Sequence, residues 1–142
     1  WVYSTHGNNF VKTMLNLMNT KPDLSVISDQ IGSPTYAKGL AKVCIASLTE
    51  HINGIHHYTD TGVASWFDFA VAIQRMGLEL GLLDKKIPIK PITTAQYPTP
   101  AKRPHYSVLD KSSLENALPE LKFSHWQEQL HIMITALKAE QS

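Results

Sequence analysis

Residues 24–35 read Leu24-Ser25-Val26-Ile27-Ser28-Asp29-Gln30-Ile31-Gly32-Ser33-Pro34-Thr35. The first five are rich in β formers and predict a strand. The remainder, from Asp29, consists of turn residues and predicts a loop. Thr35 stands where it can cap a helix that runs to about Leu48. A strand, a polar loop and a helix in succession are typical of α/β proteins.

The same alternation extends in both directions. On the N-terminal side, 1–4 predicts a strand and Phe10 to Asn19 a helix. On the C-terminal side we expect a strand over Ile55–Thr59 and a helix from Ser65, with Asp68 completing a capping box. An extended, irregular stretch from Pro88 to Pro104 follows. Asp110 can cap a short helix that Pro119 stops, and Ser124 with Gln127 forms a second capping box before the final helix.

Four apolar stripes at helical spacing predict which helix faces are buried. Their members are Phe10, Val11, Met14, Leu15 and Met18; Leu40, Ala41, Cys44, Ile45 and Leu48; Trp66, Phe69, Ala70, Ile73 and Met76; and Trp126, Leu130, Ile134 and Leu137. Cys44, on the second stripe, is expected to be a buried, inert thiol. The predicted class is therefore α/β, but three strands are few for a parallel sheet, and they suggest the trailing edge of a larger one.

Length, net charge and cysteine content limit the classes of function that the chain can have. The 142 residues suit one domain, and the net charge of +1 gives no electrostatic reason to expect nucleic acid or an anionic membrane as partner. A single cysteine and the lack of a long apolar run favour a cytoplasmic setting without a membrane partner. The chain opens on the apolar stretch Trp1-Val2-Tyr3, so we expect it to be a fragment whose exposed sheet edges are buried in a homo-oligomer.

The motifs that carry most enzymatic chemistry are missing from the sequence. The histidine and cysteine spacings predict no metal site, and there is no Gly-x-Ser-x-Gly elbow. Neither Gly-x-Gly-x-x-Gly nor a tyrosine followed four residues later by lysine occurs. We therefore expect no catalytic residue in this chain and leave its cofactor contacts unassigned.

Two loops are candidates for binding. Residues 29–36 place polar side chains before a helix N-terminus, although a plain capped turn would look the same. Residues 97–109 combine stiffening prolines and tyrosines with Lys102 and Arg103, and an arginine fork fits a diphosphate. The alternative for this second loop is a proline-rich surface segment with solvated charges. Trp1 and Tyr3 share one strand face, where they either line a pocket or pack in the core.

Read together, these segments resemble the dTDP-4-dehydrorhamnose reductases. The motifs occur in the family order: Trp1-Val2-Tyr3-Ser4, Gly7-Asn8-Asn9-Phe10, Asp29-Gln30-x-Gly32-x-Pro34-Thr35, Gly54-x-His56-His57-Tyr58, Ser65-Trp66-Phe67-x-Phe69-Ala70 and Pro98-Thr99-Pro100-Ala101-Lys102-Arg103-Pro104. The resemblance spans essentially the whole chain. It implies the C-terminal part of a Rossmann-type extended short-chain dehydrogenase/reductase, with trailing sheet strands and a small substrate-binding domain.

The resemblance also implies a function. Such an enzyme reduces the 4-keto group of dTDP-4-dehydro-L-rhamnose with NADPH or NADH, which the missing N-terminal half would mainly bind. The implied substrate contacts are Trp1, Asn9, Gln30 and Arg103. Rossmann elements would occupy about 1–20 and 36–80, interleaved with substrate-binding segments at about 21–35 and 81–142. A non-catalytic nucleotide-sugar-binding or regulatory homologue is the main alternative, and an epimerase or dehydratase of the same fold is a third.

Overall fold

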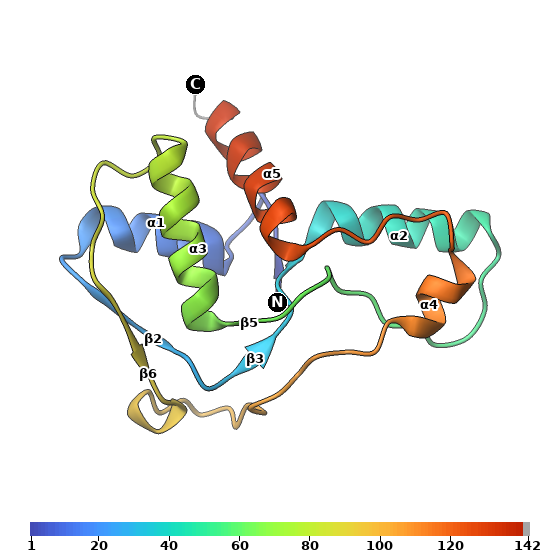
Figure 1. The fold of residues 1–142 in the computed structure, drawn as a ribbon, viewed down its shortest axis with the longest axis horizontal. Coiled ribbons are helices and arrows are strands. Elements are labelled where there is room, and N and C mark those ends of the chain that lie inside the picture. Colours follow the sequence, from blue (N-terminus) through green and yellow to red (C-terminus); the bar gives the residue numbers. More distant parts are fainter. Residues whose placement is uncertain (141–142) are drawn as a thin grey trace.

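A computed structural model describes residues 1–140 (Figure 1). Its helices are α1 (Phe10–Thr20), α2 (Ala37–Thr49), α3 (Trp66–Glu79), the 3-10 helix η1 (Thr94–Gln96), α4 (Ser112–Ala117) and α5 (Trp126–Ala139). Its strands are β1 (Val2–Tyr3), β2 (Leu24–Ile27), β3 (Ile31–Gly32), β4 (Thr35–Tyr36), β5 (Ala64–Ser65) and β6 (Ile89–Ile92). No helix within residues 1–140 has the length and apolar character needed to cross a membrane.

The strands form three short pairs. β1 pairs in parallel with β4, β2 pairs in parallel with β6, and β3 pairs antiparallel with β5. The β2–β6 pair matches Leu24 with Ile89 and Ile27 with Ile92, so it joins residues 24–27 to a segment far along the chain. Parallel pairs joined through helices confirm the predicted α/β class.

The main core lies between α1, α3 and α5, which stand together on one side of Figure 1. Three of the predicted stripes supply it, and Val11, Ile73 and Leu130 are completely buried. Gly77 of α3 lets the neighbouring elements approach closely, because a Cβ there would lie 2.9 Å from the side chains of both Leu15 and Leu83. Phe10 and Trp66 are the exceptions in these three stripes, since each is only half-buried.

The predicted buried stripe on α2 is wrong. Cys44 is exposed, and Ile45 and Leu48 are 65% and 76% exposed. Only Val43 of α2 is buried, in a small separate cluster with Leu114 and Leu118. Figure 1 shows that α2 extends away from the three-helix core, with only its N-terminal end close to α5. The apolar face exists, but nothing within residues 1–140 covers it.

The predicted strand over 55–59 is also wrong, because these residues have no strand partner among those described and Ile55 is 88% exposed. The segment between Pro88 and Pro104 is more regular than predicted, since it contains β6 and η1. The loop predicted over 29–35 likewise contains β3 and the first residue of β4.

The helix caps agree only in part with the sequence. Ser65 and Asp68 form the predicted capping box of α3. Thr35 does not cap α2, because its hydroxyl donates to the Ser33 carbonyl instead. At α5 the cap is His125, whose Nδ1 accepts from the Gln127 N–H, in place of the predicted Ser124. Asp110 does accept a hydrogen bond from the Ser112 N–H, one residue earlier than the position that caps α4.

Candidate functional site

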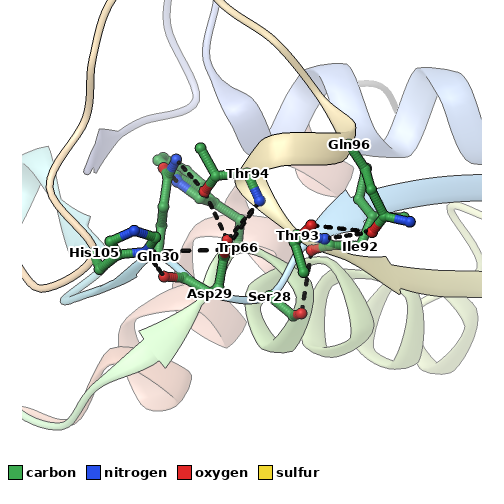
Figure 2. A network of polar contacts seen from close by, with 9 residues as sticks. All are labelled: Ser28, Asp29, Gln30, Trp66, Ile92, Thr93, Thr94, Gln96 and His105. Atoms are coloured by element: carbon green, nitrogen blue, oxygen red, sulfur yellow. Dashed lines mark hydrogen bonds and ion pairs between the residues drawn. The ribbon is translucent and has the colours of Figure 1, made fainter.

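Gln30 lies in the turn between β2 and β3, with 5% of its surface exposed. Trp66 Nε1, at the start of α3, donates to Gln30 Oε1 at 3.2 Å. Gln30 Nε2 in turn donates to Thr94 Oγ1 of η1 at 3.1 Å. Figure 2 shows the amide held between these two partners. The oxygen and the nitrogen of one buried side-chain amide therefore connect three segments that are far apart in sequence.

Asp29 fastens the same turn to η1. Its carboxylate accepts from the Thr94 hydroxyl at 2.7 Å and from the Thr94 N–H at 2.9 Å (Figure 2). These hydrogen bonds hold the pKa of the Asp29 carboxyl below its usual value. His105 Nδ1 donates to the Asp29 carbonyl at 2.8 Å. The loop that carries Arg103 is thus attached to the loop that carries Gln30.

An aromatic wall stands beside this network. The rings of Trp1 and Trp66 are stacked, with centroids 3.7 Å apart and an interplanar angle of 10°. Phe10, at the start of α1, packs against Trp66 at 4.8 Å. The N–H that Trp66 donates to Gln30 fixes the orientation of its indole, and the stack in turn fixes Trp1. The wall is rigid and apolar, with polar groups at its edge.

Two adjoining hollows meet at Gln30, Trp66 and Arg103. The larger, of about 540 Å³, is mostly apolar and lies against α1 and β2. Its walls are Phe10, Met14, Leu17, Leu24, Ser25, Val26, Ile27, Gln30, Trp66, Tyr97, Thr99 and Arg103. The smaller, of about 380 Å³, is bounded by Trp1, Gln30, Trp66, Arg103, Pro104 and Ser107.

Arg103 is the cationic residue that lines both hollows. Its guanidinium is exposed and makes no ion pair or hydrogen bond within residues 1–140. An unpaired guanidinium beside an aromatic wall and a buried amide suits a ligand that has both a flat ring and an anionic group. The two linings supply a guanidinium, a buried amide and aromatic rings, all of which can bind such a ligand.

Three of the four sequence-predicted contacts come together here, since Trp1, Gln30 and Arg103 line the smaller hollow. Asn9 lies elsewhere. Its Oδ1 accepts from the Lys12 N–H at 3.2 Å and its Nδ2 donates to the Ser4 carbonyl at 2.7 Å, so it caps α1. The sequence pattern placed Trp66 only in the core. The signal that could have placed it in the site is its position in the first turn of a capped helix.

The glycines of the described residues do not form a phosphate cradle. The glycines with positive φ are Gly7, Gly54, Gly62 and Gly81, which lie in four separate turns. Phosphate cradles of the Rossmann type need several glycines in one strand-to-helix turn. No part of residues 1–140 offers that arrangement. Nor do three or more His, Cys, Asp or Glu side chains gather as metal ligands in this part of the chain.

The fold and the site together define the C-terminal part of an extended short-chain dehydrogenase/reductase. UDP-glucuronic acid 4-epimerase from Bacillus cereus has the same fold, with a TM-score of 0.70 at 14% identity, and this likeness concerns the fold only. Within that class, the chain belongs to the RmlD substrate binding domain family, whose profile matches residues 1–139.

Relatives with higher identity agree. The chain is 45% identical over 131 residues to the spore coat polysaccharide biosynthesis protein SpsK of Bacillus subtilis, covering 92% of this chain and 43% of that protein. It is 40% identical to the dTDP-4-dehydrorhamnose reductase of Aggregatibacter actinomycetemcomitans, covering 92% and 46%. The crystal structure of a dTDP-4-dehydrorhamnose reductase from Clostridium acetobutylicum matches with a TM-score of 0.86 at 43% identity, over 97% of this chain and 46% of that one. The chain therefore spans about half the length of these relatives.

Proposed function

We propose that this chain is the substrate-binding half of an NAD(P)H-dependent reductase that converts the 4-keto group of dTDP-4-dehydro-L-rhamnose to the alcohol of dTDP-L-rhamnose. The observation that carries the proposal is the junction of two hollows at Gln30, Trp66 and Arg103. A nucleotide-sugar has an aromatic base, a diphosphate and a polar sugar, which correspond to the apolar hollow, the guanidinium and the amide. Membership of the family and its named reductases support the reaction.

Each predicted contact has a role in this proposal. Arg103 pairs with the diphosphate through its fork of N–H groups. In the smaller hollow, the ring of Trp1 packs against the sugar. Gln30 offers the sugar its second amide hydrogen and its second oxygen lone pair. Asn9 remains a predicted contact, and its cap on α1 also positions Phe10 in the larger hollow.

The division of labour within the chain is also a proposal. We place trailing Rossmann elements at about 1–20 and 36–80, and substrate-binding segments at about 21–35 and 81–142. The cofactor, NADPH or NADH, would be held mainly by the half of the relatives that this chain does not span. A relative from Bacillus anthracis, 33% identical with a TM-score of 0.83, was crystallised in complex with NADP. The proposed setting is the cytoplasm.

Binding is tested by titrating dTDP into the chain and following tryptophan fluorescence. Trp1 and Trp66 line the hollows, whereas Trp126 is 3% exposed in the core and gives a constant background. We expect saturable quenching, and at least about tenfold weaker binding in Arg103→Ala, since a charge-assisted pair contributes about 1.5–3 kcal/mol. Arg75→Ala is the matched control, because Arg75 pairs with Glu79 on the outer face of α3.

Equal affinities of Arg103→Ala and Arg75→Ala for dTDP would show that Arg103 is not part of the site.

The reaction itself is tested by following NADPH oxidation with the keto-sugar in a protein that carries both halves. Turnover supports the reductase. Tight dTDP binding without turnover would favour the alternative, a nucleotide-sugar-binding homologue without catalysis.

We also propose that the protein forms a homo-oligomer. Support comes from the exposed apolar face of α2, on which Ile45 and Leu48 lie one helical turn apart. We expect sedimentation velocity at micromolar concentration to show a species larger than a monomer, and Ile45→Lys with Leu48→Lys to reduce it to the monomer. A wild-type chain that sediments as a monomer would contradict this proposal. It would favour contact of the α2 face with the half of the relatives that this chain does not span.

A further inference from the structure

A hollow of about 270 Å³ lies apart from the candidate site, between the first half of α2, residues 121–124 and α5. We call it the lysine hollow, after Lys38, Lys42 and Lys122. Its other walls are Tyr36, Gly39, Val43, Tyr58, Leu121, Ser124, Gln129 and Ile132. It shares no residue with either hollow of the candidate site, so it calls for a separate explanation.

The three lysines are unpaired. All are exposed, and none makes an ion pair or side-chain hydrogen bond within residues 1–140. Two acidic side chains nearby, Glu50 and Glu120, line a different hollow at the C-terminal end of α2. Three like charges around one concavity raise the local potential and attract anions. The N-terminal end of the α2 dipole adds to the same field.

Neutral donors complete the lining. The Ser124 hydroxyl and the Gln129 amide are half-buried and have no side-chain hydrogen bond within the described residues. Two carboxylates oppose an anion here: the exposed Glu140, which with burial raises the pKa of the Tyr36 hydroxyl, and Asp60, which is bonded to Tyr58. Asp60 is fully buried, and its oxygens accept from the Tyr36 N–H and the Tyr58 hydroxyl, both at 2.9 Å. Neither carboxylate lines the hollow, and the polar side chains that do line it are cationic or able to donate hydrogen bonds.

We propose that the lysine hollow binds a small polyanion of the phosphate or diphosphate class, independently of the candidate substrate site. Its size admits a compact anion. It has no stacked tryptophan wall like that of the candidate site, so an isolated anionic group fits it better than a nucleobase. A long polyanion such as nucleic acid is disfavoured by the net charge of +1.

The test is calorimetric titration with inorganic pyrophosphate. It is done in an Arg103→Gln background, so that the candidate site does not contribute and the proposed function is not being tested. We expect a saturable isotherm that weakens as salt rises. Adding Lys42→Gln and Lys122→Gln should weaken binding at least about tenfold, since each removes a charge-assisted contact of about 1.5–3 kcal/mol.

The matched control is Lys85→Gln with Lys86→Gln, two exposed lysines that line none of the hollows described above and precede β6. It should change the affinity less than twofold. Pyrophosphate should also raise the melting temperature of the parent and not of the Lys42/Lys122 variant. No binding to the Arg103→Gln chain, or equal loss in both double variants, overturns the proposal. Because all four lysines are exposed, far-UV circular dichroism is expected to be unchanged.

Discussion

Gln30 joins three segments through one buried amide, which makes it the residue on which the geometry of the candidate site most depends. We predict that Gln30→Ala lowers the free energy of unfolding by about 1–3 kcal/mol, because Trp66 Nε1–H and the Thr94 hydroxyl both lose a partner. Urea denaturation measures the change. Gln127→Ala, on the exposed face of α5, is the control and should shift stability by less than about 0.5 kcal/mol. Equal effects in the two variants would mean that the network does not hold the site.

Asp60 is a fully buried carboxylate. Burial raises the pKa of its carboxyl, while hydrogen bonds from Tyr36 and Tyr58 and the nearby His125 and Lys111 offset part of that rise. A carboxyl with a raised folded-state pKa binds its proton more tightly when folded than when unfolded. The unfolded value is about 3.9. Stability contributed by Asp60 is therefore lost as pH rises from about 4 through the folded-state pKa.

We predict that the unfolding free energy of the wild type, minus that of Asp60→Asn, decreases as pH rises across this window and then becomes constant. Urea denaturation at a series of pH values from about 4 upward measures it. Asp84→Asn, at an exposed position, is the matched control. A difference that instead increases with pH would show that hydrogen bonds to the ionised form outweigh its burial.

At the scale of helices, α5 and α2 carry similar apolar patterns with opposite outcomes. Leu130 of α5 is completely buried, and Ile45 of α2 is 65% exposed. We predict that Leu130→Ala costs about 2–5 kcal/mol of unfolding free energy, since it leaves a cavity in the core. Ile45→Ala should cost less than about 0.5 kcal/mol when measured on the monomer. Thermal and urea unfolding of the two variants provide the comparison, and a similar cost would mean that α2 is covered.

At the scale of the whole molecule, the chain has a large core around α1, α3 and α5 and a small cluster that joins α2 to α4. We predict that, in the monomer, backbone amides of α2 and α4 exchange with deuterium faster than those of α3 and α5. Local opening of α2 exposes little buried apolar surface and so costs less free energy than global unfolding. Hydrogen exchange followed by mass spectrometry tests this, and uniform protection across the four helices would contradict it.

The sequence predicted the parts of the fold that depend on local pattern. The stripes beginning at Phe10, Trp66 and Trp126 are buried, and the Ser65–Asp68 capping box forms. Errors arose where the outcome depends on distant residues. Ser124 loses its cap position because its carbonyl accepts from the Thr61 N–H, which draws this segment toward 61 and leaves His125 to cap α5.

The candidate site divides in the same way. Sequence reasoning named Trp1, Gln30 and Arg103, which lie in three separate segments, and the structure brings them to one hollow. It did not give Trp66 a place in the site, because the position on a helical stripe indicates a core residue whether or not a cavity opens beside it. The Trp1 stack and the hydrogen bond to Gln30 are contacts between segments that no local pattern encodes.

By itself, the sequence determined the α/β class and the buried stripes of three helices, since these follow from short-range periodicity, and it named segments for a candidate site from residue chemistry. Only the tertiary structure decided that the α2 face stays exposed, that 55–59 forms no strand, and that Gln30 joins β2, α3 and η1. Burial and strand pairing depend on what lies opposite a residue in space, which short-range sequence patterns do not record.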